Sequence, residues 1–503
     1  MNRDNPGSLT LRQRLRFLAK DSILYGGAAS FNKAFALLTF PMLARHFPVE
    51  AYGVYDFLNV SISLLAILLV FGQDSAVARF FYEHPDPASR RSVISQSFFF
   101  QTGVLALTLF CLWLGADRLA GWSGQAGVDG GLVKLLLLQI PFLVLINFSQ
   151  NILKWTFSRA HFLTISLGST VVSMSALLIG LYWFDVGLAE IFGIFLGTRA
   201  IFGLLGLWFC RRWLVWPADW RYLKPMVLFA APYGIICAVS ASIPALERTF
   251  IVGFLGEREL GLFAAGAKIA MMMSLPIQAF QVAWGPFSLA LHKQADAHVT
   301  YNHVLRGFSM GILILAMLLT VIAEPAIRLL ASSQYAGASI VVFPLAMAFA
   351  FQGLSGIVTV GITLSKKSYL NLFSYFLYLA VSVGGIYLLI GPWGLAGVAW
   401  GGMLGRLAMT VAEAWLSQRV YPLAWGFRKV VPCYGIALLW GLASQAVFLR
   451  VGMWPGMGLS AAGLILAVPA IAGVLFTRSE RRRLWTWLGG RWRAAFAGKA
   501  LAT

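Results

Sequence analysis

Apolar stretches of about 20 residues, long enough to cross a bilayer as helices, recur along most of this chain. Hydrophobic residues make up 59% and charged residues 12% of its 503 positions, and the mean hydropathy is +0.77. A helix satisfies its backbone hydrogen bonds internally, as a lipid environment demands. We therefore predict an all-α polytopic membrane protein with about fourteen transmembrane helices. The expected spans are 22–47, 55–72, 94–116, 132–155, 163–183, 188–210, 226–250, 260–285, 304–323, 338–364, 368–390, 394–416, 431–449 and 455–476.

The chain resembles itself when it is shifted by 207 or 208 positions. The segments that coincide include Tyr52-Gly53-Val54-Tyr55 with Leu260-Gly261-Leu262-Phe263, Gly187-Leu188-Ala189 with Gly394-Leu395-Ala396, and Leu196-Gly197 with Leu404-Gly405. Many carriers are built from internal repeats of this kind. We expect the first twelve spans to form two six-helix lobes, followed by two C-terminal helices. Because six is even, both lobes enter the bilayer from the same side, so the repeat is parallel.

Loop charges indicate how the chain is oriented. Of its 39 lysines and arginines, 28 lie in the terminal segments and the even-numbered loops, so the positive-inside rule places both termini in the cytoplasm. Topology and contact with anionic lipids then account for the net charge of +20. Because these charges are dispersed through short loops, we predict no nucleic-acid binding. The expected organisation is a cytoplasmic segment 1–21, an N-lobe 22–210, a cytoplasmic linker 211–225, a C-lobe 226–416, helices 13 and 14 within 431–476, and a basic cytoplasmic tail 477–503.

Some basic residues lie inside the predicted spans, where a cation costs about 2.5–3.5 kcal/mol unless its stem reaches the interface. These residues are Lys33, Lys134, Arg199, Arg248, Lys268 and Arg406. Lys134 is close enough to a helix start to act as an interfacial anchor. Arg248 adjoins Glu247, which makes a structural ion pair one interpretation of both residues.

The remaining four cations are candidates for a binding site. Arg199 and Arg406 are repeat equivalents, and they either brace their lobes or line a cavity. Lys33 lies near the middle of the first span, where its stem cannot easily reach the interface, and Lys268 lies in the second span of the other lobe. We expect Lys33 and Lys268 to face one water-filled cleft between the lobes.

Carboxylates are scarcer than cations within the spans. Glu413 and Glu247 are the candidates for coupling transport to a proton or another ion, and Asp56, Asp74 and Glu190 lie near span ends. Each unpaired cation in a medium of low dielectric constant needs a partner, so the excess of cations predicts an anionic ligand. The four cysteines form no disulfide or metal-ligand spacing, and we predict neither a metal site nor a cofactor.

The first two spans carry a recognisable pattern. It consists of Phe40-Pro41, Ala44-Arg45, Glu50, Tyr52-Gly53-Val54-Tyr55 and Gly72-Gln73-Asp74-Ser75-Ala76-Val77-Ala78-Arg79-Phe80-Phe81. This pattern resembles the N-terminal signature of the bacterial polysaccharide flippases. These are the O-antigen, capsule and exopolysaccharide exporters of the multidrug/oligosaccharidyl-lipid/polysaccharide superfamily.

The resemblance implies a two-lobed carrier in the bacterial inner membrane. Such a carrier flips an undecaprenyl-diphosphate-linked oligosaccharide from the cytoplasmic to the periplasmic leaflet by alternating access, beside a polysaccharide polymerase and glycosyltransferases. The resemblance also implies residue roles. Lys33 and Lys268 would meet the diphosphate, and Arg248, Arg199 and Arg406 would line the cavity. The gate candidates are Arg45, Asp74 and Arg79.

Three alternatives stay open from the sequence. A peptidoglycan lipid II flippase has the same helix count, and a multidrug antiporter of the same superfamily fits the fold but not the excess of cations. A membrane-embedded glycosyltransferase or ligase usually needs a large outer loop with acidic or histidine groups. The longest predicted outer loop, residues 117–131, offers only Asp117 and Asp129. We therefore predict a transporter rather than an enzyme.

Overall fold

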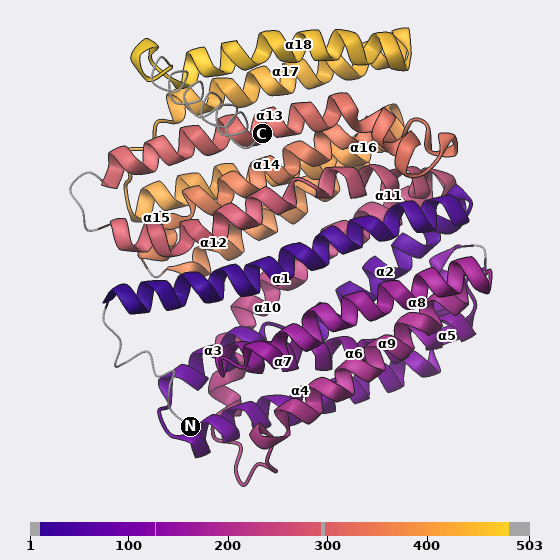
Figure 1. Cartoon of the computed structure of the whole chain (residues 1–503), viewed down its shortest axis with the longest axis vertical. Coiled ribbons are helices and arrows are strands. Elements are labelled where there is room, and N and C mark those ends of the chain that lie inside the picture. The colour runs from indigo at the N-terminus through magenta and orange to yellow at the C-terminus, as the bar shows by residue number, and fades with distance from the viewer. Residues whose placement is uncertain (1–10, 126, 293–296, 366, 482–503) are drawn as a thin grey trace, which may run out of the picture.

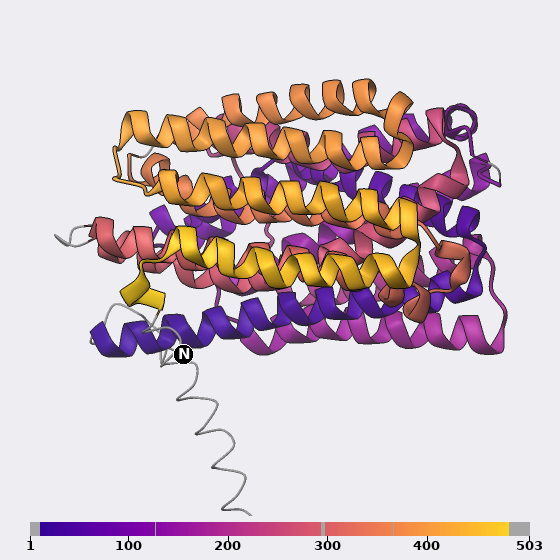
Figure 2. The ribbon, with the colours of Figure 1, turned by 90° about the horizontal axis from the view of Figure 1, so that it is seen from above.

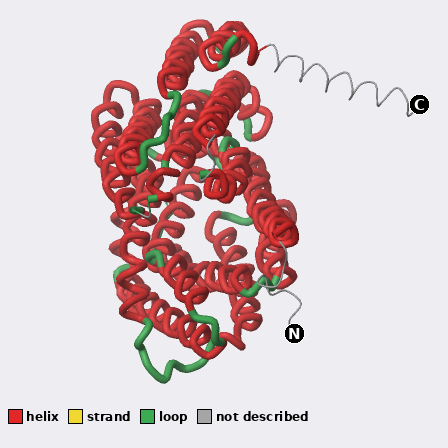
Figure 3. Tube along the Cα trace, turned by 90° about the vertical axis from the view of Figure 1, so that its left-hand side faces the viewer, coloured by secondary structure: helices red, strands yellow, loops and turns green. Residues whose placement is uncertain are grey.

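The computed structural model describes residues 11–125, 127–292, 297–365 and 367–481, and every regular element within these ranges is a helix (Figure 1, Figure 3). The prediction of an all-α protein is confirmed. The outer parts of the predicted cytoplasmic segment 1–21 and basic tail 477–503 lie outside the described residues.

The N-terminal half comprises the elements from α1 to η3. They are α1 (Leu11–His46), α2 (Val49–Val70), α3 (Gln73–Glu83), α4 (Pro87–Leu114), α5 (Ala116–Ser123), α6 (Gly130–Trp155), α7 (Arg159–Leu163), the π-helical turn η2 (Thr164–Gly168), α8 (Ser169–Trp183), α9 (Leu188–Cys210) and η3 (Arg211–Trp213). Two aspartates start helices in this half by accepting a hydrogen bond from a first-turn amide. Asp86 accepts from Ser89 N at 2.7 Å and Asp129 from Leu132 N at 2.7 Å.

The C-terminal half comprises the elements from α10 to α16, and a helical pair follows it. They are α10 (Leu223–Phe254), α11 (Glu257–Met271), α12 (Ser274–Leu291), α13 (Ala297–Leu330), η4 (Ser333–Tyr335), η5 (Ala338–Val341), α14 (Val342–Val358), α15 (Val360–Leu364), η6 (Ser368–Leu370), α16 (Asn371–Val420), α17 (Phe427–Val451) and α18 (Met453–Leu475). Figure 1 shows the N-terminal half below, the C-terminal half above and α17–α18 along the upper edge. Figure 2 shows that the long helices run roughly parallel to one another.

The predicted count of fourteen spans is not confirmed. Among the described residues, eleven helices are long and apolar enough to cross a membrane, or twelve if α11 and α12, which meet at a 40° bend, form one broken span. One of the eleven, α16, has two limbs, because Gly394 has φ 52° and ψ −129° and interrupts the helix. A Cβ atom on Gly401 would collide with the backbone of Ile386, so the second limb folds back along the first.

The two halves meet at a pair of repeat-related glycines. Gly53 on α2 and Gly261 on α11 coincide in the internal repeat, and a Cβ atom on Gly53 would lie 2.6 Å from the backbone nitrogen of Gly261. Only a residue without a side chain allows helix backbones to approach so closely. The duplicated Tyr-Gly-Val-Tyr and Leu-Gly-Leu-Phe segments thus form a contact between the halves.

Gly53→Ala is expected to lower the free energy of unfolding by about 1–3 kcal/mol, the usual cost of overpacking a close contact. The added methyl group would press on backbone atoms, which cannot rotate away as a flexible side chain would. Thermal unfolding of the purified protein in detergent measures the effect. Gly103→Ala is the matched control, since a Cβ atom there meets nothing within 4 Å. Equal melting temperatures for the two variants would contradict this account of the interface.

One buried core joins the halves at the end of the bundle where α1 ends at His46 and α13 ends at Leu330, which we call the distal end. Phe40, Tyr52 and Tyr335 form an aromatic group there, with ring centroids 5.7–6.5 Å apart, and all three side chains are almost fully buried. Phe263 and other apolar side chains of α11, α14 and α16 complete this core. The distal end is therefore closed by apolar packing across the two halves.

The opposite end, where α3 ends at Glu83, we call the proximal end. Its two main cores are separate within the described residues. One contains Phe81 and Ile94 with Met226 and Ala230 of the first turns of α10, and the other lies among α12–α18. At the proximal end the first turns of α10 therefore join the core of the N-terminal half, whereas the core among α12–α18 stays separate from it.

Candidate functional site

A cluster of four charged side chains crosses the boundary between the halves. Arg248 Nε on α10 donates to Asp56 Oδ2 on α2 at 3.0 Å, and Arg248 Nη1 lies 3.1 Å from Glu247 Oε2. Lys268 Nζ on α11 lies 3.6 Å from Asp56 Oδ1. The Arg248 guanidinium also lies over the Phe263 ring, 5.1 Å from its centroid. Asp56 therefore holds two cations of the C-terminal half from the other half.

The members of this cluster differ in accessibility. The side chains of Arg248 and Asp56 are 8% and 5% exposed, whereas that of Lys268 is 25% exposed. The helix α11 contacts α1 and α2 of the N-terminal half and α10, α13 and α14 of the C-terminal half. The Lys268 side chain nevertheless keeps a quarter of its surface exposed. Arg248 and Asp56 form a buried structural pair, and Lys268 is the cation of the cluster that a ligand can approach.

Lys33 lies on α1, which runs between the two halves in Figure 1. Its side chain is half-buried, and no hydrogen bond or ion pair to another described residue involves it. Lys33 is two helical turns from Gly26, and residues at this spacing share a helix face. Gly26 faces Val282 of α12 at ordinary contact distance. Lys33 is thus a cation with no ion pair among the described residues, and it lies on a helix face that borders the C-terminal half.

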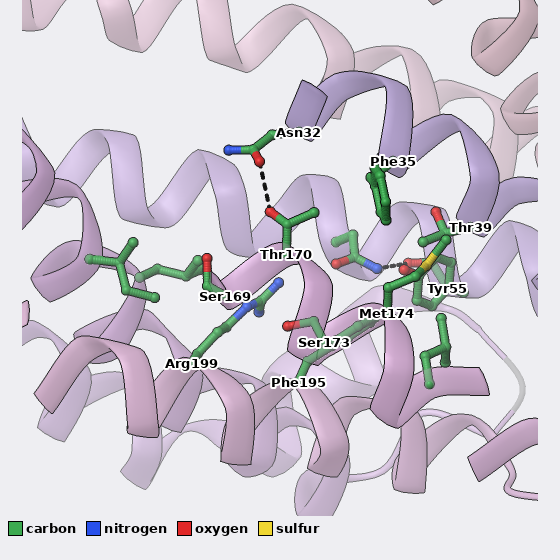
Figure 4. A pocket seen from close by; sticks show the side chains of 14 residues that line it. Asn32, Phe35, Thr39, Tyr55, Ser169, Thr170, Ser173, Met174, Phe195 and Arg199 are labelled. Atoms are coloured by element: carbon green, nitrogen blue, oxygen red, sulfur yellow. Dashed lines mark hydrogen bonds between the residues drawn. The ribbon is translucent and has the colours of Figure 1, made fainter. Parts of the chain in front are cut away.

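A cavity of about 320 Å³ with both polar and apolar side chains in its wall lies within the N-terminal half, between α1, α2, α6, α8 and α9 (Figure 4). We call it the polar cavity after the hydrogen-bonding groups that reach it. Asn32, Thr170 and Ser173 contribute amide and hydroxyl groups to its wall. Arg199 of α9 points into it and also donates to the amide oxygen of Gln139. The cavity was not predicted, although Arg199 was named as a candidate cavity residue.

The repeat-related arginines occupy different surroundings. Arg199 borders the cavity, with its guanidinium 5.4 Å from the centroid of the Phe195 ring. Arg406 donates to the Tyr378 hydroxyl at 3.0 Å and lies over the Tyr378 ring at 4.1 Å. Arg406 therefore braces the hairpin formed by the two limbs of α16.

The two candidate coupling carboxylates are buried and already bonded. Glu413 on α16 accepts a hydrogen bond from the Ser355 hydroxyl of α14 and is 2% exposed. Glu247 is paired with Arg248, and a Cβ atom on Gly402 of α16 would press on its carboxylate. Neither residue lines the polar cavity. Ion coupling by Glu413 or Glu247 stays a prediction.

The three gate candidates lie in different places. Arg45, at the end of α1, donates to the carbonyl oxygens of Leu329 and Leu330 at the end of α13, so it links the two halves at the distal end. Asp74 accepts from Asn147 at 3.1 Å and stays within the N-terminal half. Arg79 pairs with Glu83 and lies over the Phe229 ring of α10 near the proximal end.

The amino-acid sequence from residue 42 to residue 340 matches the protein family described as polysaccharide biosynthesis protein. The chain belongs to this family. The match covers more than half of the chain, and it confirms the resemblance to the polysaccharide flippases.

Two related proteins come from Haemophilus influenzae. The chain is 23% identical to "Lsg locus putative protein 1" over 63% of its own length and 78% of that protein. It is 24% identical to an uncharacterized membrane protein over 61% of this chain and 73% of that protein.

Solved transporter structures share the fold. The lipid II flippase MurJ in an inward closed conformation superposes with a TM-score of 0.69 at 13% identity, covering 90% of this chain and 98% of MurJ. An inward-facing multidrug resistance transporter of the MATE family gives a TM-score of 0.62 at 16% identity, covering 77% of this chain and 94% of that transporter. The polysaccharide biosynthesis protein is therefore a multi-pass membrane protein with a MurJ-like and MATE-like fold.

Proposed function

We propose that this protein flips an undecaprenyl-diphosphate-linked oligosaccharide across the bacterial inner membrane by alternating access, with both termini in the cytoplasm. The observation that carries the proposal is the charge cluster between the halves, where Lys268 is held by Asp56 and remains partly accessible. A diphosphate carries the same kind of oxygen ligand as a carboxylate, with more negative charge. It can therefore take the place of Asp56 beside Lys268.

If Lys268 releases Asp56 and binds a diphosphate instead, substrate binding is linked to movement of the two halves. Asp56 would keep Arg248 as a partner at 3.0 Å, so no buried carboxylate would be left unpaired. The contact between α2 and α11 would lose one of its ionic links. A substrate that binds Lys268 would thus weaken the attachment of the two halves, as a carrier that rocks about a central site requires. Lys33, which has no partner among the described residues, supplies a second cation for the same ligand.

The distal end would face the periplasm, given the predicted cytoplasmic termini. Its aromatic core and the Arg45 bonds to α13 then describe a state closed to the periplasm. In the next step of the cycle the distal core would separate, while the polyprenyl tail stays in lipid and only the polar head passes between the halves.

The two halves pack more tightly on one side of their boundary than on the other, which supports an opening toward the lipid on the looser side. A Cβ atom on Gly72 would lie 2.5 Å from the backbone nitrogen of Gly234, so the α2–α3 junction packs tightly on α10. On the other side, a Cβ atom on Gly26 of α1 would meet only the side chain of Val282 on α12, at 3.7 Å. The side where α1 borders α12 is therefore the better route for the lipid tail.

Deleting the gene in the source bacterium tests the proposed function. We expect complete lipid-linked oligosaccharides to accumulate in the cytoplasmic leaflet, while the leaflet distribution of lipid II stays unchanged. Shortened or unligated glycans would instead indicate a glycosyltransferase or ligase, and accumulation of lipid II would indicate a peptidoglycan precursor flippase. Unchanged glycans with greater sensitivity to toxic cations would indicate a multidrug antiporter. A plasmid-borne wild-type copy that restores export is the control.

A further inference from the structure

The polar cavity in the N-terminal half has the chemistry of a sugar-binding site. Asn32 Oδ1 accepts from the Thr170 hydroxyl at 3.0 Å (Figure 4). Asn32 Nδ2 donates to the Ser166 hydroxyl at 2.9 Å. The side chain of Asn59 donates to Tyr55 O at 3.1 Å, which leaves its amide oxygen available to the cavity. Fixed amides and hydroxyls of this kind bind the hydroxyl groups of a saccharide.

Aromatic rings complete the wall between these polar groups. Phe35, Tyr55 and Phe195 line the cavity from α1, α2 and α9, and the ring centroids of Tyr55 and Phe195 are 6.5 Å apart. Flat apolar surfaces beside a few convergent polar groups are typical of small-molecule sites. Such surfaces suit the C–H faces of a pyranose ring. The volume of about 320 Å³ is enough for a single sugar ring.

The charge of the cavity sets the class of sugar. Arg199 points into it, and only Nη1 of its guanidinium has a hydrogen bond among the described residues, to Gln139. No aspartate or glutamate is among the described residues that line the cavity. A partly buried guanidinium with free donors and no carboxylate nearby favours an anionic ligand, and its planar fork matches a carboxylate.

We propose that this cavity is a subsite for a sugar residue that bears a carboxylate, such as a uronic acid, within the transported glycan. The inference rests on the proposed function, since the glycan arrives attached to the lipid diphosphate. The helix α2 separates this subsite from the charge cluster. Tyr55 and Asn59, four residues apart, face the cavity, while Asp56 faces Arg248 and Lys268. A diphosphate at Lys268 and an acidic sugar beside Arg199 would therefore lie on two sides of one helix.

Binding of two matched glycosides to the purified full-length protein in detergent tests the subsite. Methyl β-glucuronide and methyl β-glucoside have the same pyranose ring, and only the glucuronide bears a carboxylate. Inorganic diphosphate, as a competitor, tests whether Arg199 merely recognises phosphate. We expect the wild type to bind the glucuronide at least about tenfold more tightly than the glucoside, as a charge-assisted contact provides. In Arg199→Gln this ratio should fall to about one, because the ring contacts remain and the ionic contact is lost.

Arg211→Gln is the matched control for the loss of charge. Arg211 follows the same helix, is exposed, and donates to Trp208 O at 2.9 Å outside the cavity. This variant should keep the wild-type ratio. If Arg199→Gln does not fold, Arg199→Lys preserves the positive charge, and its ratio should stay well above one. Equal binding of both glycosides by the wild type, or competition of the glucuronide by diphosphate with no effect of Arg199→Gln, would overturn the proposal.

The outcome is separable from that of the proposed function. If lipid-linked oligosaccharides are flipped in proteoliposomes but the free glucuronide shows no preference, the subsite is wrong and the flippase function stands. If the glucuronide binds through Arg199 but no lipid-linked oligosaccharide is flipped, the subsite stands and the flippase function is wrong.

Discussion

Arg248→Met is expected to lower the free energy of unfolding by about 3–5 kcal/mol, the cost of removing one partner from a buried ion pair. Arg248 is the closest cation to both Asp56 and Glu247, at 3.0 and 3.1 Å. Without it, Glu247 would lose its ion-pair partner and Asp56 would keep only the more distant Lys268, at 3.6 Å. Thermal unfolding and the yield of monodisperse protein in detergent measure the loss.

Two further variants show whether unpaired charge is the cause. Adding Glu247→Gln and Asp56→Asn to Arg248→Met should recover part of the lost stability, since the buried carboxylates are then neutral. Arg79→Met is the control for an accessible pair. Arg79 is 54% exposed and lies 2.7 Å from Glu83, and the loss of such a surface pair costs about 0–1 kcal/mol. A similar small loss for Arg248→Met would show that the cluster does not hold the halves together.

Much of the fold follows from local features of the sequence. Long apolar stretches predict helices and the duplicated glycine segments predict a repeat, and the helical class is confirmed. The number of spans is not confirmed, although two of the bends agree with the predicted boundaries. The predicted spans 368–390 and 394–416 separate close to Gly394, whose positive φ interrupts α16, and the predicted span 260–285 covers both α11 and α12, which meet at a 40° bend.

The candidate site was predictable only in part, because its contacts join distant parts of the chain. The position of Arg248 next to Glu247 is visible in the sequence, but its contact with Asp56 joins residues 192 positions apart. The sequence places Asp56 near a span end and gives no sign that it is the centre of the cluster. The cavity beside Arg199 could not be predicted because Ser, Thr and Asn are common in membrane helices, and only tertiary packing shows that Asn32, Asn59 and Ser173 surround one cavity.

Combining Lys33→Met with Lys268→Met is expected to abolish transport while the protein still folds. A hydrogen bond between a cation and a phosphate contributes about 1.5–3 kcal/mol, so each lysine should account for about ten- to 150-fold in transport rate. Lys33 has no ion pair among the described residues, and Asp56 retains Arg248 when Lys268 is replaced. Neither substitution therefore leaves a buried carboxylate alone, which separates these variants from Arg248→Met.

Flipping of lipid-linked oligosaccharides by purified protein in proteoliposomes measures this effect, with melting temperature measured in parallel. Lys134→Met removes another cation from a membrane helix, α6, at a position expected to anchor at the interface, and it should transport normally. Lys268→Arg keeps a cation for both Asp56 and a diphosphate and should retain most activity. We expect replacement of Lys268 to lower transport without lowering stability, whereas replacement of Arg248 should lower both. Wild-type transport by the Lys33→Met/Lys268→Met variant would show that the diphosphate binds elsewhere. A melting temperature as low as that of Arg248→Met would instead make Lys268 a structural partner of Asp56.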